Sequence, residues 1–136
     1  MKIAVSASGD GLDANVDPRF GRCSYFIIVE TEDNEIKSHK EISNEAIQAS
    51  RGAGVQAAQI VANEGAEVVI TGNIGPNAFN VLSQAGIKII TGVSGKVSEV
   101  VKKYLKGELK ETTKPTVGFG SGMGGGMGRG RWNQQK

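Results

Sequence analysis

Cysteine and histidine are nearly absent from this 136-residue chain, which holds one of each. The lone cysteine, Cys23, excludes an internal disulfide and any cysteine-only metal site within one chain. The lone histidine, His39, lies in a stretch of alternating charges that is typical of an edge strand, so we expect it to face solvent. The sequence therefore offers few of the side chains that usually ligate metals.

Long apolar runs and clustered charges are also missing. No apolar run approaches the ~20 residues of a membrane span, and the N-terminus becomes polar too soon for a signal peptide. The formal net charge is only +2, and the basic residues are scattered, which argues against a nucleic-acid or membrane surface. We therefore expect a cytoplasmic domain that binds neither nucleic acid nor membranes.

Proline and aromatic residues are few, whereas glycine is abundant, with 20 residues. Much of that glycine lies in Gly118–Gly130, a segment that cannot bury enough apolar surface to offset its ordering entropy. The composition predicts one α/β domain over residues 1–110 and a disordered glycine- and methionine-rich tail over residues 111–136. Met123 and Met127 could capture a soft ion such as Cu(I), although a glycine-rich segment does not fix their geometry.

Apolar periodicity over positions 1–110 predicts five strands and three helices. Strands are indicated over 2–6, 24–30, 36–42, 68–70 and 88–90, with a polar turn over 31–35. Helices are indicated over 54–63, from Pro76 to Gly86, and from an N-cap at Ser94 to Leu105. The expected architecture is a five-stranded mixed sheet with one antiparallel strand, helices on both faces and the first strand paired with the fourth.

Two near-copies of one motif, Thr71-Gly72 and Thr91-Gly92, each join a strand to a helix. In a parallel sheet both turns should lie on the same edge, where helix N-termini present free backbone N–H groups and positive dipole ends. Gly52 and Gly54 begin a third helix at that edge. The glycines either admit an anion to the backbone or simply allow short turns. No turn matches a nucleotide-binding fingerprint.

The loop Asp17–Cys23 is the second candidate site. Arg19 and Arg22 are permanently charged donors suited to an anion, and Phe20 can fill the core. Beside Arg22, Cys23 could have a lowered pKa and act as a soft metal ligand. The alternatives are that Cys23 is a small buried side chain and that Arg19 forms an ion pair with Asp17 or Asp13.

These motifs together resemble the dinitrogenase iron–molybdenum cofactor biosynthesis family. The resemblance extends from about Lys2 to Leu105 and rests on Asp17–Arg22, Tyr25-Phe26, Gly52-Ala53-Gly54 and Thr71–Ala78. It implies a ribonuclease H-like α/β/α three-layer sandwich. It also implies that the protein binds or carries an anionic metal–sulfur cluster, such as an iron–molybdenum precursor, and that it is not an enzyme.

Several members of that family carry histidine or cysteine before the first helix, where this chain has Ser43–Arg51 without either. A cluster would therefore be held electrostatically by backbone amides and arginine, with Cys23 as the single candidate metal ligand. The residues expected at the site are Ser8, Arg19, Phe20, Arg22, Gly52, Gly54, Thr71, Gly72, Asn73, Gly75, Asn77, Thr91 and Gly92.

Two other functions are weighed against the cluster carrier. The same turns would suit a small phosphorylated or carboxylated metabolite. A metal-dependent nuclease would need clustered carboxylates, but the first strand has none and Asp10, Asp13 and Asp17 lie in loops. We expect cluster donor or acceptor proteins as partners, and a monomer or weak dimer.

Overall fold

The computed structural model describes residues 1–49 and 51–116 of the chain. Its strands and helices, in chain order, are β1 (Lys2–Ala7), η1 (Phe20–Arg22), β2 (Tyr25–Glu32), β3 (Glu35–Ser43), η2 (Glu45–Gln48), α1 (Ala53–Asn63), β4 (Val68–Ile70), α2 (Pro76–Gln84), β5 (Lys88–Ile90) and α3 (Val97–Leu105). No α-helix in these two ranges is long and apolar enough to cross a lipid bilayer.

The five strands form one mixed sheet in the order β3-β2-β1-β4-β5. The central strand β1 pairs in parallel with β4, as expected, and β4 pairs in parallel with β5. β2 is antiparallel to both of its neighbours, and it is thus the one strand that runs against the others. The connection between β2 and β3 is tighter than expected, because Asp33 and Asn34 alone turn the chain, both with positive φ.

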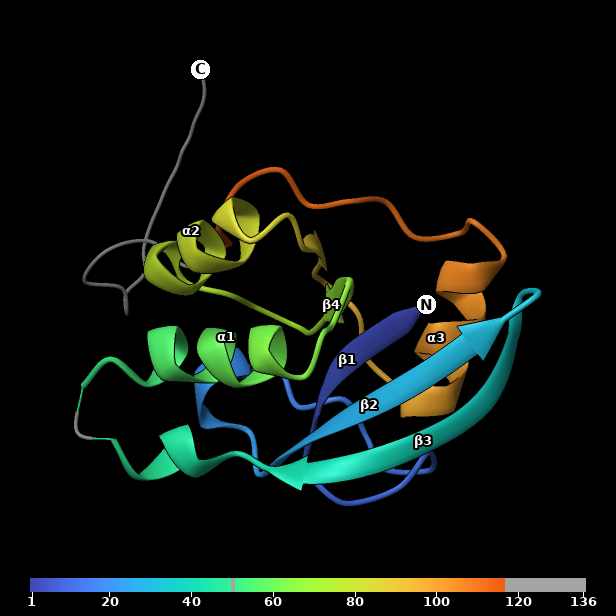
Figure 1. The fold of residues 1–136 in the computed structure, drawn as a ribbon, viewed down its shortest axis with the longest axis horizontal. Helices are drawn as coiled ribbons and strands as arrows, with labels where there is room; N and C mark the ends of the chain where they lie inside the picture. The colour runs from blue at the N-terminus through green and yellow to red at the C-terminus, as the bar shows by residue number, and fades with distance from the viewer. Residues whose placement is uncertain (50, 117–136) are drawn as a thin grey trace.

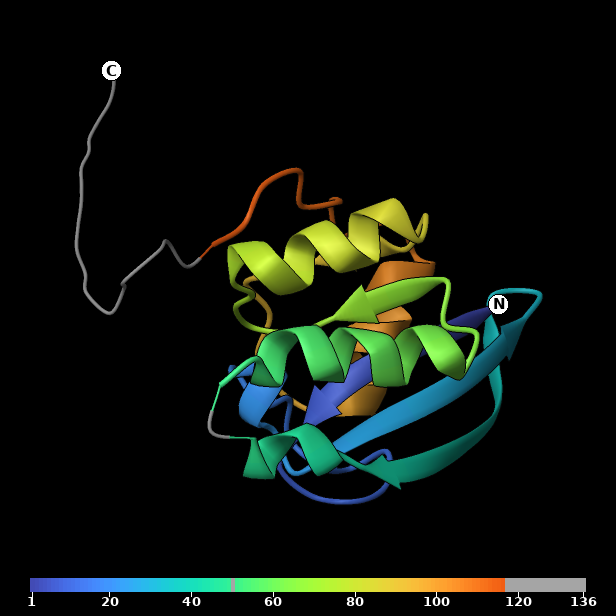
Figure 2. The same ribbon diagram turned by 60° about the vertical axis from the view of Figure 1, so that its left-hand side comes forward.

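Helices cover both faces of the sheet, which confirms the predicted α/β/α sandwich with ribonuclease H-like topology (Figures 1 and 2). Alternate strand residues point to opposite faces. On one face Ala4, Ile28 and Val69 pack with α1 and α2. On the other face Ile3, Val5 and neighbouring apolar residues pack with α3.

The start of α3 differs from the expectation. Ser94 is not its N-cap, because Gly95 turns the chain with φ 108° and the helix begins two residues later, after Lys96. The amides of Val97 and Ser98 donate to the carbonyls of Ala14 and Leu12, at 2.9 and 3.0 Å. The first amides of α3 are therefore already hydrogen-bonded to the loop that follows β1.

The described residues after α3 form no helix or strand, but they are hydrogen-bonded to the rest of the fold. Residues 109–116 form a strap along the sheet edge, in which the Thr112 amide donates to the Ile89 carbonyl at 2.6 Å. The Thr116 amide donates to the Ile74 carbonyl at 3.0 Å. Residues 111–116 of the tail expected over residues 111–136 belong to this strap. The expectations for residues 117–136, including Met123 and Met127, lie outside the described residues.

Candidate functional site

A cavity of about 440 Å³ lies where α1 and α2 begin, against the loop that leads into η1. Figures 1 and 2 show both helices starting on the same side of the molecule. The wall of the cavity contains no acidic residue, histidine or cysteine. The lining residues are Pro18, Arg19, Phe20, Gly21, Gly52, Ala53, Gly54, Val55, Asn73, Ile74, Gly75, Pro76, Asn77 and Ala78.

Neither helix that opens into the cavity has its first turn capped by a side chain. The N-cap residues are Gly52 for α1 and Gly75 for α2, and neither offers a side-chain acceptor. The first amides of a helix lack intrahelical partners and form the positive end of its dipole. Pro76 at the first position of α2 has no amide, so the amides of Asn77 and Ala78 follow it. The cavity is consequently suited to an anion.

Glycines hold the loop and the helices close together. A Cβ on Gly72 would lie 2.6 Å from the Cα of Pro18, and one on Gly21 would lie 2.9 Å from the Gly54 amide nitrogen. The Asn73 amide donates to the Pro18 carbonyl at 2.8 Å. By contrast, a Cβ on Gly75 would have no neighbour within 4 Å. Gly72 and Gly21 thus permit close backbone packing, whereas Gly75 leaves open space.

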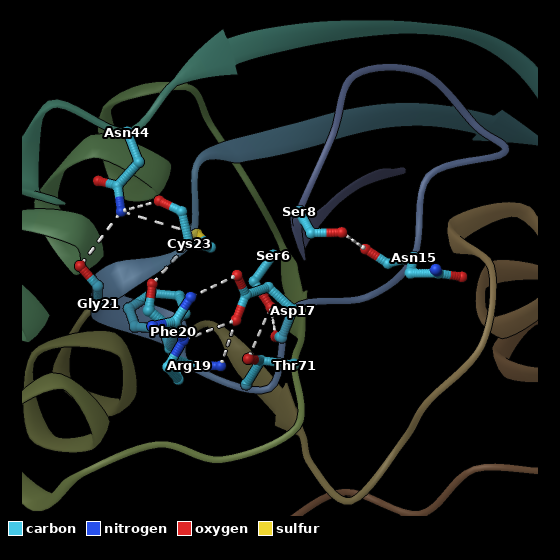
Figure 3. Close-up of polar contacts among 10 residues, drawn as sticks. All are labelled: Ser6, Ser8, Asn15, Asp17, Arg19, Phe20, Gly21, Cys23, Asn44 and Thr71. Atoms are coloured by element: carbon cyan, nitrogen blue, oxygen red, sulfur yellow. Dashed lines mark hydrogen bonds and ion pairs between the residues drawn. The ribbon is translucent and has the colours of Figure 1, made fainter.

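Arg19 forms an ion pair with Asp17, one of the two alternatives that the sequence left open (Figure 3). Its Nε lies 3.2 Å from Oδ1 and its Nη2 lies 3.3 Å from Oδ2. The bond to Asp17 raises the pKa of Arg19 further above its usual value. The Asp17 side chain is buried, while the Arg19 side chain is 67% exposed at the cavity wall. Arg19 can therefore meet a ligand, with part of its charge already balanced by Asp17.

Ser8 and Thr71 were expected at the site, but neither lines the cavity. Thr71 is fully buried, and its Oγ1 lies 2.7 Å from the hydroxyl of Ser6, which also lies 2.7 Å from the Asp17 carbonyl oxygen. The Ser8 hydroxyl donates to the Asn15 carbonyl at 3.3 Å. These polar groups join β1, β4 and the intervening loop (Figure 3).

Arg22 does not line the cavity, contrary to expectation. Its Nη1 donates to the carbonyls of Ile47 and Ala49, at 3.0 and 2.8 Å, and so holds the segment after β3. Phe20 is 3% exposed and packs against Phe26 with a ring-centroid distance of 5.3 Å. Phe20 fills the core as the sequence predicted, and it also borders the cavity.

Of the two possibilities that the sequence left open for Cys23, a lowered pKa is the one that its surroundings contradict. The side chain is fully buried, and burial raises the pKa of its thiol to about 12. Its Sγ lies 3.4 Å from the Phe20 carbonyl oxygen and 3.7 Å from Nδ2 of Asn44 (Figure 3). Cys23 is therefore a neutral interior side chain outside the cavity wall, the alternative that the sequence left open, and a poor candidate for a metal ligand.

Thr91 and Gly92, the second Thr-Gly turn, are not among the residues that line the cavity. The Thr91 amide donates to Oγ1 of Thr112 at 3.0 Å, and the Gly92 amide donates to the Gly72 carbonyl at 2.8 Å. Both amides are thus already paired within the fold, while the bond between Gly92 and Gly72 brings the two turns together at one edge. The first turn does contribute to the cavity, through Asn73, Gly75 and Asn77.

Sequence reasoning missed two kinds of residue. The apolar part of the wall, including Pro18, Val55 and Ile74, carries no polar signal. Thr112 and Thr116 follow the last helix, where a polar segment without periodicity looks like a tail. The two threonines lie four residues apart, and each hydroxyl accepts a hydrogen bond from the amide of a turn that follows a strand. That spacing was the signal in the sequence that could have indicated the strap.

Residues 1–49 and 51–116 contain no group of three or more histidine, cysteine or acidic side chains that could hold a metal ion. A bare cation therefore has no ligand set in the described structure. An anion that already carries its own ligands fits the cavity better, because amides and a guanidinium recognise negative charge.

Comparisons with known proteins identify a family and several similar proteins. Residues 1–107 match the family model described as dinitrogenase iron-molybdenum cofactor. An uncharacterised protein of Methanocaldococcus jannaschii is 38% identical over 105 residues, covering 77% of this chain and 86% of that protein. The apo form of the orange protein of Desulfovibrio gigas has a TM-score of 0.80 at 38% identity, covering 85% of this chain and 95% of that one. A Thermotoga protein provisionally named NifB has a TM-score of 0.66 at 32% identity, covering 85% and 97%.

Proposed function

Since this chain belongs to the dinitrogenase iron-molybdenum cofactor family, we propose that it binds and carries an anionic metal–sulfur cluster or its precursor. The observation that supports this function best is the cavity between the first turns of α1 and α2. It combines two uncapped helix N-termini with Arg19 and has no acidic residue in its wall.

The proposed cargo carries its own sulfide ligands, so the protein need not supply thiolates. The amides of Gly54 and Val55 from α1, and those of Asn77 and Ala78 from α2, would donate to the outer sulfides. Arg19 would add a charged donor at the wall. A cavity of about 440 Å³ lies within the range of about 300–1,000 Å³ typical of small-ligand sites.

A carrier role also agrees with the lack of catalytic side chains in the cavity wall. The lining residues include no serine, cysteine, histidine or carboxylate, and these are the usual nucleophiles and general bases. Among the polar side chains of the wall, Arg19, Asn73 and Asn77 can bind and orient an anion. We therefore propose that the protein is not an enzyme and exchanges its cargo with donor and acceptor proteins.

The test is anaerobic binding of tetrathiomolybdate, followed by reconstitution with iron, sulfide and molybdate. The wild-type chain should retain one coloured complex per molecule after desalting. Gly75→Leu should fill the open space beside α2 and lower the affinity about tenfold or more, equivalent to about 1.4 kcal/mol. Asn80→Leu is the matched control, because it adds the same side chain to the same helix at an exposed position outside the wall.

A colourless wild-type protein without retained metal would contradict the cluster-carrier function. Equal affinity of Gly75→Leu and Asn80→Leu would place the site elsewhere.

A second candidate, a small phosphorylated or carboxylated metabolite, would use the same cavity. It is favoured by the absence of a metal-ligand group among the described residues. It predicts that some member of a metabolite panel raises the unfolding temperature and shifts the amide resonances of residues 71–77, whereas tetrathiomolybdate does not.

A further inference from the structure

A further hollow, which we call the α3 groove, lies on the face of the sheet that α3 covers. It has a volume of about 830 Å³ and lies between α3 and the turn that joins β2 to β3. It shares no lining residue with the cavity at the start of α1 and α2. The residues that line the α3 groove are Leu12, Asn34, Glu35, Ile36, Ser98, Lys102, Leu105 and Lys106.

Backbone hydrogen bonds hold the walls of the α3 groove in place. The Ser98 amide donates to the Leu12 carbonyl at 3.0 Å and so fixes the loop after β1 against α3. The facing wall is the tight turn at Asp33 and Asn34, after which β3 pairs with β2 from Glu35 onward. The groove is therefore built by the fold itself and does not depend on a ligand.

Three partly exposed side chains give the groove an apolar surface. Leu12, Ile36 and Leu105 pack against the core cluster beneath α3, yet each keeps part of its surface open to solvent. Removal of apolar surface from water favours binding. The groove consequently suits a ligand with an apolar body.

The α3 side of the groove is cationic. Lys102 and Lys106 lie four residues apart, both are exposed, and neither forms an ion pair among the described residues. Like charges at this spacing repel each other, and an anion held between them would remove that repulsion. Glu35, the one acidic residue of the lining, has its Oε1 3.8 Å from Nζ of Lys37. The charge of the groove therefore favours a negative ligand.

We propose that the α3 groove binds an organic anion with an apolar body, such as a medium-chain carboxylate. The apolar body covers Leu12, Ile36 and Leu105, and the carboxylate lies between Lys102 and Lys106. Small-molecule sites typically measure about 300–1,000 Å³ and combine apolar surface with a few polar groups, as this groove does. A protein partner fits less well, because stable protein interfaces use about 20–30 residues a side, far more than line the groove.

The test uses the full-length chain with the fluorescent probe anilinonaphthalene sulfonate and with decanoate as the competitor. The wild type should bind the fluorophore saturably, and decanoate should displace it and shift the amide resonances of residues 34–36 and 98–106. Decanol has the same apolar chain without the charge, so it should compete about tenfold more weakly through loss of two ion pairs. Tetrathiomolybdate should not displace the fluorophore, because the two sites share no residue.

Lys102→Gln combined with Lys106→Gln should weaken decanoate binding about tenfold and leave decanol binding unchanged. Lys103→Gln combined with Lys110→Gln is the matched control, because it removes two exposed cations that do not line the groove. At physiological salt these more distant charges are screened, so the control should change decanoate affinity by about twofold or less.

Three results would overturn the proposal. One is a wild-type chain that does not bind decanoate saturably. Another is equal weakening by the two double variants, which would mean that net charge alone attracts the anion. The third is a set of resonance shifts confined to residues 52–55 and 73–78, which would place decanoate in the other cavity. The cluster-carrier function is judged separately, by retention of tetrathiomolybdate, and either conclusion can fail while the other stands.

Discussion

Gly72 and Gly75 are three positions apart, yet a methyl group would meet different surroundings at each. At Gly72 it would lie 2.6 Å from the Pro18 backbone, whereas at Gly75 it would meet nothing within 4 Å. Gly75 also has an ordinary φ of −83°. We expect Gly72→Ala to lower the free energy of unfolding by about 1–3 kcal/mol through overpacking, and Gly75→Ala to change it by about 0.5 kcal/mol or less. Urea denaturation measures both, and equal midpoints would contradict the assignment.

The buried thiol of Cys23 makes the stability of the fold depend on alkaline pH. Its pKa is raised from 9.0 to about 12 in the folded state by burial. Its contribution to the free energy of unfolding is therefore complete below pH 9 and is lost as the pH rises toward 12, because the unfolded state releases the proton first. The slope from this one group approaches about 1.4 kcal/mol per pH unit.

Cys23→Ala isolates that contribution. The variant should lose some stability at pH 7 through the small void it leaves, and the difference from wild type should shrink between pH 9 and pH 11 in urea denaturation. It should still retain tetrathiomolybdate, because Cys23 lies outside the cavity wall. A constant stability difference across that pH range, or loss of the probe, would contradict the interior role of this thiol.

Residue roles were harder to predict than residue positions. The segment Asp17–Cys23 was correctly singled out, but its members serve different partners. Arg19 reaches the cavity wall, Arg22 binds the carbonyls of Ile47 and Ala49, and Cys23 is buried. Side-chain direction depends on the turn that η1 makes and on partners that lie beyond β2 and β3 in the chain, and neither is encoded in local spacing.

Among the elements, the strap is the one whose function is most directly testable. Thr112 and Thr116 accept hydrogen bonds from the amides of Thr91 and Ile74, the two turns that follow β5 and β4. Thr116→Val should lower the free energy of unfolding by about 1 kcal/mol through loss of the hydrogen bonds of its hydroxyl with the Ile74 amide and carbonyl. It should also speed hydrogen exchange at the Ile74 amide. Thr113→Val is the control, because Thr113 is exposed between the two.

The outcome that would contradict this role is specific. If Thr113→Val and Thr116→Val have the same effect on exchange at Ile74, the strap is not held by its Thr116 hydroxyl. Thr112→Val should act on the Thr91 amide in the same way and leave Ile74 unchanged, which separates the two anchor points.

Elements with strong periodicity were predictable, and those defined by long-range partners were not. The five strands, their pairing at the centre and the three helices follow from apolar spacing and glycine stops. The start of α3 was misplaced because its first amides are satisfied by the carbonyls of Leu12 and Ala14, which belong to the loop after β1. The strap was missed for a similar reason, since its hydrogen bonds join it to turns that local sequence does not reveal.

On the scale of the whole molecule, the three helix N-termini have different surroundings. Those of α1 and α2 border the cavity and have no side-chain cap, whereas the first amides of α3 are hydrogen-bonded to another part of the chain. The parallel strands β1 and β4 end on the same side of the sheet. The strand order runs outward in opposite directions from these two strands, and open α/β sheets usually bind ligands at such a point. α1 and α2 start there on one face of the sheet. α3 starts on the other face with its amides taken by the loop after β1. A cavity flanked by two donor helices is the result.

This asymmetry predicts where binding stabilises the molecule. Loop 18–21, α1 and α2 come from separate parts of the chain and meet only in the folded state, so an anion held between them stabilises the native state alone. At 100 times its dissociation constant the gain is about 2.7 kcal/mol. Tetrathiomolybdate should therefore raise the unfolding temperature of the wild type and of Asn80→Leu, but not that of Gly75→Leu at the same concentration. Hydrogen exchange should slow at the first turns of α1 and α2 and remain unchanged at the first turn of α3. Uniform slowing across the three helices would mean that the anion binds without preference for this cavity.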